Sequence, residues 1–200
     1  MKDTYKTITQ NTLGDYREKG SKFFAYVFPI EDENDFKEQL EIIRKEHPQS
    51  RHACYAYRIG YEGERYRAND DGEPSNSAGT PILNALLSAE VTFAASVVIR
   101  YFGGTKLGVP GLINAYRTST LLGLEDNKTV EKTIRKTLHF EFPYDKTGDF
   151  MRLANKYDVV FGEQQFGEKC GQAIDIKISQ VDSIKDDLTE LYGIDLQDEN

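Results

Sequence analysis

The segment from Arg100 to Gly111, RYFGGTKLGVPG, combines glycines and cations in a way that suits an anion. Glycines let backbone N–H groups approach a phosphate closely, and a helix that begins after such a loop adds partial positive charge. The segment is not a Walker loop, because Thr105 precedes the lysine, and it is not a dinucleotide fingerprint. A tight turn between a strand and a helix is the structural alternative. The candidates for phosphate binding in this segment are Arg100, Gly103, Gly104 and Lys106.

Three further basic residues extend this candidate set. Arg51 and His52 are neighbours on a predicted strand, so their side chains point to opposite faces. A surface arginine and a hydrogen-bonded internal histidine are the structural alternative. Arg117 lies on the helix predicted after the glycine-rich loop, where an exposed arginine needs no function. Cys54 shares the strand face of His52, which is only suggestive of a nucleophile with its base.

Three carboxylates, Asp70, Asp71 and Glu73, lie within four residues and form a possible acidic site. Such a group can hold a hard cation or supply a general base. A solvated acidic turn is the alternative, and the spacing does not fit the twelve-residue calcium loop. We predict no cofactor and no metal centre.

The composition sets limits on the class of protein. The 200 residues carry a formal net charge of −8, and 38% of them are hydrophobic. The longest apolar run, 93–99, is far shorter than the roughly 20 residues of a membrane helix. The first residues lack the apolar core of a secretory signal, so we expect a cytoplasmic protein whose two cysteines are reduced. The negative charge disfavours a generally basic nucleic-acid binder but leaves room for a local basic patch.

The charge is divided unevenly along the chain. Residues 1–128 carry 16 basic and 18 acidic side chains, a balance of −2, whereas residues 129–200 carry 9 and 15, a balance of −6. The composition changes at the polar stretch 125–128. We therefore predict one domain over 1–128 and a second over 129–200, joined near Asn127.

Hydrophobic periodicity predicts the elements that must position these residues. The first domain is expected to have strands within 5–30, a helix over 32–46, strands over 51–59, 65–68 and 93–99, and two helices. The first of these helices is expected to have Thr80 as its N-cap, and the second to open at Pro110. The second domain is expected to have strands over 133–142, 158–166, 169–179 and 194–196, with helices over 146–156 and 181–192. The order βαββα is typical of a ferredoxin-like sandwich, and the fold class is α+β.

Several separated segments together resemble one family. In chain order they are EKGSKF from Glu18, SRHA from Ser50, DDGEP from Asp70, AGTP from Ala78 and RYFGGTKLG from Arg100. This order resembles the IMPACT/YigZ family over about residues 15–123. The C-terminal βαββα pattern is similar to the accessory domain of the bacterial two-domain members.

The resemblance implies a fold and a functional setting. The first domain would share the βαβ-type fold of the second domain of a small-subunit ribosomal protein, which also occurs in translation factor EF-G. The second would resemble a ferredoxin-like domain of EF-G. Eukaryotic members regulate translation by binding the activator of a stress kinase, whereas nucleic-acid or ribosome binding is the usual suggestion for bacterial members. The chain departs from the family pattern at Pro110 and Asn114, and Asn114 removes a cation from the anion site.

We derive three functional hypotheses. The first is a non-enzymatic binder of RNA or of a ribosome-associated complex, with a role in translation or stress regulation, that uses the basic set Arg51, His52, Arg100, Gly103, Gly104, Lys106 and Arg117. The second is an adaptor that binds a protein partner, favoured by the acidic C-terminal helix. The third is a small-molecule or phosphate-handling enzyme that uses the acidic turn and Lys106. No membrane partner is expected.

Overall fold

The computed structural model describes residues 2–191 and 193–197, and the chain divides into two compact units. The larger unit runs from Tyr5 to Lys132, and the smaller combines the residues before Tyr5 with those from Thr133 onward. Strand β7 (Thr129–Thr133) pairs with β1 (Thr4–Ile8). Because of this pairing, the division between the units falls after Lys132, four residues later than the predicted boundary after 128.

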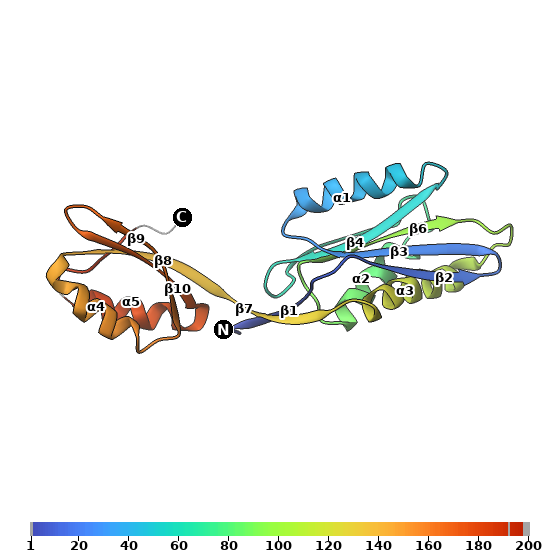
Figure 1. Cartoon of the computed structure of the whole chain (residues 1–200). Helices are drawn as coiled ribbons and strands as arrows, with labels where there is room; N and C mark the ends of the chain where they lie inside the picture. Colours follow the sequence, from blue (N-terminus) through green and yellow to red (C-terminus); the bar gives the residue numbers. More distant parts are fainter. Residues whose placement is uncertain (1, 192, 198–200) are drawn as a thin grey trace. The chain divides into compact units, whose positions relative to one another are not determined.

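The larger unit contains a five-stranded antiparallel sheet in the order β2-β3-β6-β4-β5. Helix α1 covers one face, and helices α2 and α3 cover the other (Figure 1). The elements of this unit, besides β1 and most of β7, are β2 (Thr12–Glu18), β3 (Ser21–Pro29), α1 (Glu33–Glu46), β4 (His52–Ile59), β5 (Arg65–Asn69), α2 (Gly79–Ser88), β6 (Ala94–Tyr101) and α3 (Gly108–Glu125).

Successive side chains along each strand point to opposite faces of this sheet, and apolar side chains on both faces form two cores. Phe23 and Val27 on β3 face α3, where they share a core with Tyr116. The predicted face of β4, which consists of Ala53, Tyr55, Tyr57 and Ile59, packs on the opposite side with Phe36 of α1. The sheet is therefore covered on both faces, and only its ends and edges are free to present polar groups.

Helices α2 and α3 begin at residues other than the predicted ones. Helix α2 begins at Gly79, and the Asp70 carboxylate accepts hydrogen bonds from the backbone N–H groups of Ala78 (3.0 Å) and Gly79 (2.8 Å). Thr80 therefore is not the cap of this helix. Helix α3 begins at Gly108, whose φ of 73° suits a residue without a side chain, so Pro110 is its third residue.

The smaller unit has the sheet order β11-β8-β10-β9, with all pairs antiparallel. Its elements are β8 (Arg135–Phe142), η1 (Tyr144–Lys146), α4 (Thr147–Ala154), β9 (Val159–Phe166), β10 (Cys170–Lys177), η2 (Ile178–Gln180), α5 (Val181–Thr189) and β11 (Asp195–Leu196). This βαββαβ order is that of a ferredoxin-like sandwich, and both units together make the fold class α+β. The predicted last helix ends at Thr189 rather than 192, and Tyr192 lies outside the described residues.

Among the described residues, none of the helices has the length and apolar character that crossing a membrane requires.

Candidate functional site

A groove of about 460 Å³ lies at the end of the larger sheet where β4 begins and β6 ends. We call it the Arg51 groove; its lining residues are Gln49, Arg51, His52, Arg100, Tyr101 and Phe102. The antiparallel register sets His52 directly opposite Arg100, which brings two of the predicted residues onto one sheet face. Three of the seven basic-site candidates thus line a single groove.

The two arginines of this groove have different surroundings. The Arg51 side chain is exposed, whereas Arg100 keeps only 10% of its side chain exposed. The Arg100 Nη1 lies 2.5 Å from Oε1 of Glu73, which is itself 4% exposed. The Arg100 guanidinium also lies over the rings of Phe23 and Phe102, 5.6 and 5.7 Å from their centroids. Arg100 is therefore anchored in the fold, and Arg51 is the cation that faces solvent.

The Glu73 carboxylate joins the groove to the core beneath it. The buried Tyr116 hydroxyl of α3 donates to the same Glu73 oxygen at 2.8 Å. The thiol of Cys54 donates to the backbone carbonyl of Asp70 at 2.9 Å. Burial raises the pKa of the Cys54 thiol and of the Tyr116 phenol far above their usual ranges, so both stay protonated. A protonated, buried thiol is a poor nucleophile. The structure therefore does not favour Cys54 as a nucleophile with His52 as its base.

The three carboxylates of the acidic turn act as acceptors within the protein. Asp70 caps α2, and Glu73 binds Arg100 and Tyr116. Oδ2 of Asp71 accepts from the backbone N–H of Ala53 at 2.7 Å. In the ranges 2–191 and 193–197, no group of three or more His, Cys, Asp or Glu side chains is placed to hold a metal ion.

His52 is held by the same turn. Its Nδ1 lies 2.8 Å from the backbone carbonyl oxygen of Asp71. A carbonyl oxygen only accepts, so Nδ1 donates, and Nε2 of a neutral His52 is left as an acceptor. The acidic turn therefore sets the orientation and tautomer of one groove residue.

In the turn that follows β6, glycine is favoured at positions 103 and 104 for two different reasons. The N–H of Gly103 donates to the Ser21 hydroxyl at 3.1 Å, and a Cβ at Gly103 would lie 1.8 Å from the carbonyl carbon of Gly20. Gly104 has open space around it but a φ of 89°, which disfavours other residues. The Gly103 N–H is thus already paired within the protein.

The remaining candidates lie outside the groove. Lys106 and Arg117 are both exposed, and neither lines a cavity described here. At the family departure Asn114, the side-chain amide donates to the Tyr16 hydroxyl at 3.2 Å. Lys106 and Arg117 therefore contribute no side chain to the lining of the Arg51 groove.

A second, smaller cavity of about 190 Å³ shares Arg51 and His52 with the groove. It adds Arg44 and His47, which sequence reasoning missed. Arg44 Nη2 lies 3.4 Å from Oδ1 of Asp71, and its side chain stays 42% exposed. His47 places its two ring nitrogens 2.6 and 2.8 Å from the hydroxyls of Tyr26 and Tyr101.

Phe102 is another residue that sequence reasoning missed, and it is 60% exposed. An aromatic residue directly before two glycines is a readable signal, because such a turn leaves few atoms to cover the ring. Arg44 gives no such signal, since an arginine in the last turn of an amphipathic helix is common.

Comparisons with known proteins agree on one family. The family model described as the Impact N-terminal domain matches residues 19–124. The chain is 30% identical over 191 residues to IMPACT family member YvyE of Bacillus subtilis (strain 168), covering 96% of this chain and 88% of that protein. It is 35% identical over 117 residues to IMPACT family member YigZ of Escherichia coli (strain K12), covering 58% and 57% of the two chains. A solved structure described as a hypothetical protein shares the fold, with a TM-score of 0.70 and 22% identity over 100% of this chain and 99% of that one. The chain therefore belongs to the IMPACT family.

Proposed function

We propose that this protein binds RNA, alone or within a ribosome-associated complex, and acts as a non-enzymatic regulator of translation. The observation that carries the proposal is the convergence of Arg51, His52 and Arg100 with an exposed Phe102 on one groove. An exposed cation beside an exposed ring suits single-stranded nucleic acid, because the cation binds a phosphate and the ring stacks on a base.

Three residues of the groove and one of the adjoining cavity have separate roles in this proposal. Arg51 is exposed and free to form a forked contact with a phosphate. The Phe102 ring offers a face on which a base stacks, and the Arg100 guanidinium supports that ring from the protein side. Arg44 in the adjoining cavity supplies a second cation for the next phosphate of the RNA.

The structure also supports a choice of variant for the test. Reversing the charge of Arg100 would set a carboxylate beside the buried Glu73 and disturb the fold. Arg51 is exposed, and among the described residues it has no carboxylate partner, so Arg51→Glu changes the groove and leaves the core unchanged. Arg65→Glu, on the exposed strand β5, makes the same change in net charge away from the groove and is the matched control.

Binding of a fluorescent single-stranded RNA of about ten nucleotides to the full chain tests the proposal by anisotropy. We expect Arg51→Glu to weaken binding by about tenfold or more and Phe102→Ala by about fivefold or more. The logarithm of the affinity is expected to fall with the logarithm of salt with a slope of about two to four, reduced by about one in Arg51→Glu. The proposal fails if the full chain does not bind at low salt, or if Arg65→Glu weakens binding as much as Arg51→Glu.

A further inference from the structure

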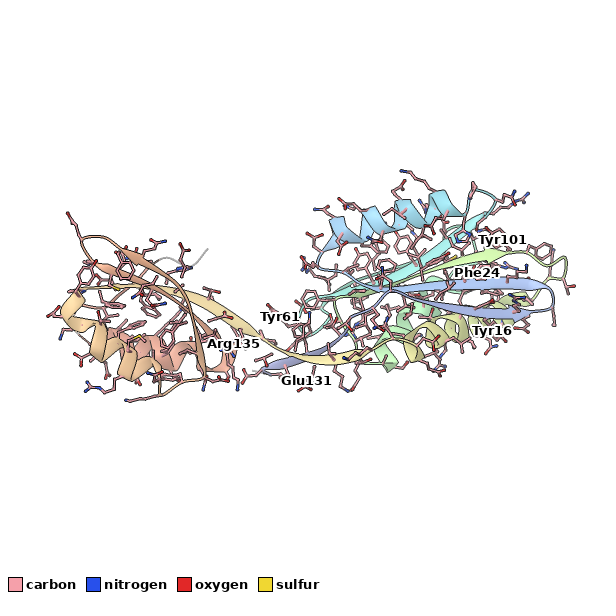
Figure 2. All side chains as sticks on the ribbon, in the orientation of Figure 1. Tyr16, Phe24, Tyr61, Tyr101, Glu131 and Arg135 are labelled. Atoms are coloured by element: carbon pink, nitrogen blue, oxygen red, sulfur yellow. The ribbon has the colours of Figure 1, made fainter. Side chains whose placement is uncertain are left out.

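A cavity of about 560 Å³ lies in the larger unit away from the Arg51 groove. It is lined by residues of β1, the β3–α1 connection and the turn between β4 and β5, and Tyr61 stands in that turn. We call it the Tyr61 cavity. Figure 2 shows Tyr61 and Tyr101 at opposite ends of the sheet, and Tyr101 lines the Arg51 groove. The two sites are therefore separate.

Three aromatic rings gather in this cavity. The ring centroids of Tyr5, Tyr61 and Phe93 lie 5.2 to 5.6 Å apart, at interplanar angles of 53 to 60°. None of these pairs is stacked, so the three ring faces are turned in different directions. A cation that lies over the face of one of these rings, within about 6 Å of its centroid, is in the range of cation–π attraction.

Two carboxylates lie beside these rings. Glu31 and Asp35 both line the cavity, and no salt bridge to either occurs in the part of the chain that the structure describes. Asp35 accepts the backbone N–H of Glu31 at 3.1 Å, which fixes its carboxylate at the cavity. Lys132 is the basic residue of the lining, so the charged groups of the cavity sum to −1.

The backbone of Phe93 is held in an unusual conformation. Its φ of 51° lies in the left-handed region, which is disfavoured for a bulky residue. Its carbonyl accepts the backbone N–H of Ile30 at 3.0 Å, and this bond helps to hold the turn. Strained residues of this kind are frequent at ligand-binding sites, and here the strained residue carries one of the three rings.

We propose that the Tyr61 cavity binds an organic cation whose nitrogen carries methyl groups, either a small quaternary amine or a methylated lysine side chain. Ring faces attract such a cation and also contact its methyl groups, while Glu31 and Asp35 supply the opposite charge. A methylated nitrogen needs few hydrogen-bond acceptors, which matches a lining of rings with carboxylates beside them. This site is independent of the RNA contacts proposed above.

Proton NMR of tetramethylammonium and of trimethyllysine added to the full chain tests the proposal. Rings around the cation are expected to shift the N-methyl signal upfield as protein is added. We expect Tyr61→Leu and Asp35→Asn each to weaken binding by about threefold to tenfold, whereas Tyr61→Phe keeps the ring and most of the affinity. Lys132→Gln removes the competing charge and is expected to strengthen binding. Preference for one of the two probes identifies the source of the cation.

Two controls make the result decisive. Tyr66→Leu removes a ring that is 65% exposed on β5, outside the cavity, and is expected to change nothing. The alcohol 3,3-dimethyl-1-butanol has the shape of choline without its charge and is expected to bind much more weakly. Equal binding of this alcohol, no upfield shift with either cation, or an equal loss in Tyr66→Leu would overturn the proposal. Because Tyr61 is half exposed, its substitution leaves the fold intact, which circular dichroism verifies.

Discussion

At the residue scale, the contact between Glu73 and Arg100 fixes one of the two arginines of the groove. Both side chains are almost fully buried, and Glu73 also accepts from Tyr116. Glu73→Gln keeps the shape and the acceptor for Tyr116 but leaves a buried guanidinium without its counter-charge. We expect it to lower the free energy of unfolding by about 3 kcal/mol.

Urea denaturation measures this loss, and the exposed pair of Arg17 and Asp15 provides the comparison. Their side chains are 63% and 41% exposed, so Asp15→Asn is expected to cost less than about 1 kcal/mol. Equal small losses in Glu73→Gln and Asp15→Asn would show that the buried pair contributes no more than a surface pair.

The sequence pointed to the residues of this contact but not to their relation. Glu73 was grouped with its neighbours Asp70 and Asp71 as an acidic site, and Arg100 with the glycine turn. Their contact joins a loop to a strand 27 residues away, and it depends on where that loop lies against the sheet. Residue types and spacing cannot supply that placement, so a carboxylate that neutralises an arginine was interpreted as a separate site.

At the element scale, helix α2 is capped from a distance. Asp70, eight and nine residues before them, accepts the N–H groups of Ala78 and Gly79 and also that of Asn76. We expect Asp70→Ala to lower the free energy of unfolding by about 2 kcal/mol, because the N–H groups of the buried Ala78 and Gly79 lose their acceptor.

Thermal and urea unfolding of Thr80→Ala gives the contrasting case. The Thr80 hydroxyl donates to the exposed Asn76 side chain at 3.0 Å and to no backbone group of the described residues, so its removal is expected to cost about 0.5 kcal/mol. A larger loss in Thr80→Ala than in Asp70→Ala would restore Thr80 as the capping residue.

Most elements could be predicted from hydrophobic periodicity, and the exceptions have a physical cause. The stripe of Phe36, Leu40 and Ile43 predicted a helix over 32–46, and α1 spans Glu33–Glu46. The βαββα order of the second unit is also confirmed. The start of α3 at Gly108 rather than Pro110 was missed, because proline at the first helical position is only a common arrangement. Caps supplied by a distant side chain leave no local pattern at all.

At the scale of the whole molecule, the charge follows the division into two units. Residues 5–132 hold 16 basic and 18 acidic side chains, a balance of −2, so the remaining residues carry −6 of the total of −8. The larger unit contains both apolar cores of its own sheet. The sequence predicted this asymmetry, but it placed the boundary before β7, whose pairing with β1 only the fold reveals.

This asymmetry predicts that a fragment of residues 5–132 binds RNA more tightly than the full chain. Removing a charge of −6 lowers the long-range repulsion of a polyanion, while the Arg51 groove stays complete. We expect a gain of about threefold to tenfold at about 10 mM salt that largely disappears at about 300 mM, because salt screens distant charges first. Anisotropy measurements on both chains at the two salt concentrations, after circular dichroism shows that the fragment is folded, provide the test. Arg51→Glu in the fragment separates groove binding from general attraction. A folded fragment that binds no more tightly than the full chain at low salt would rule out this electrostatic explanation.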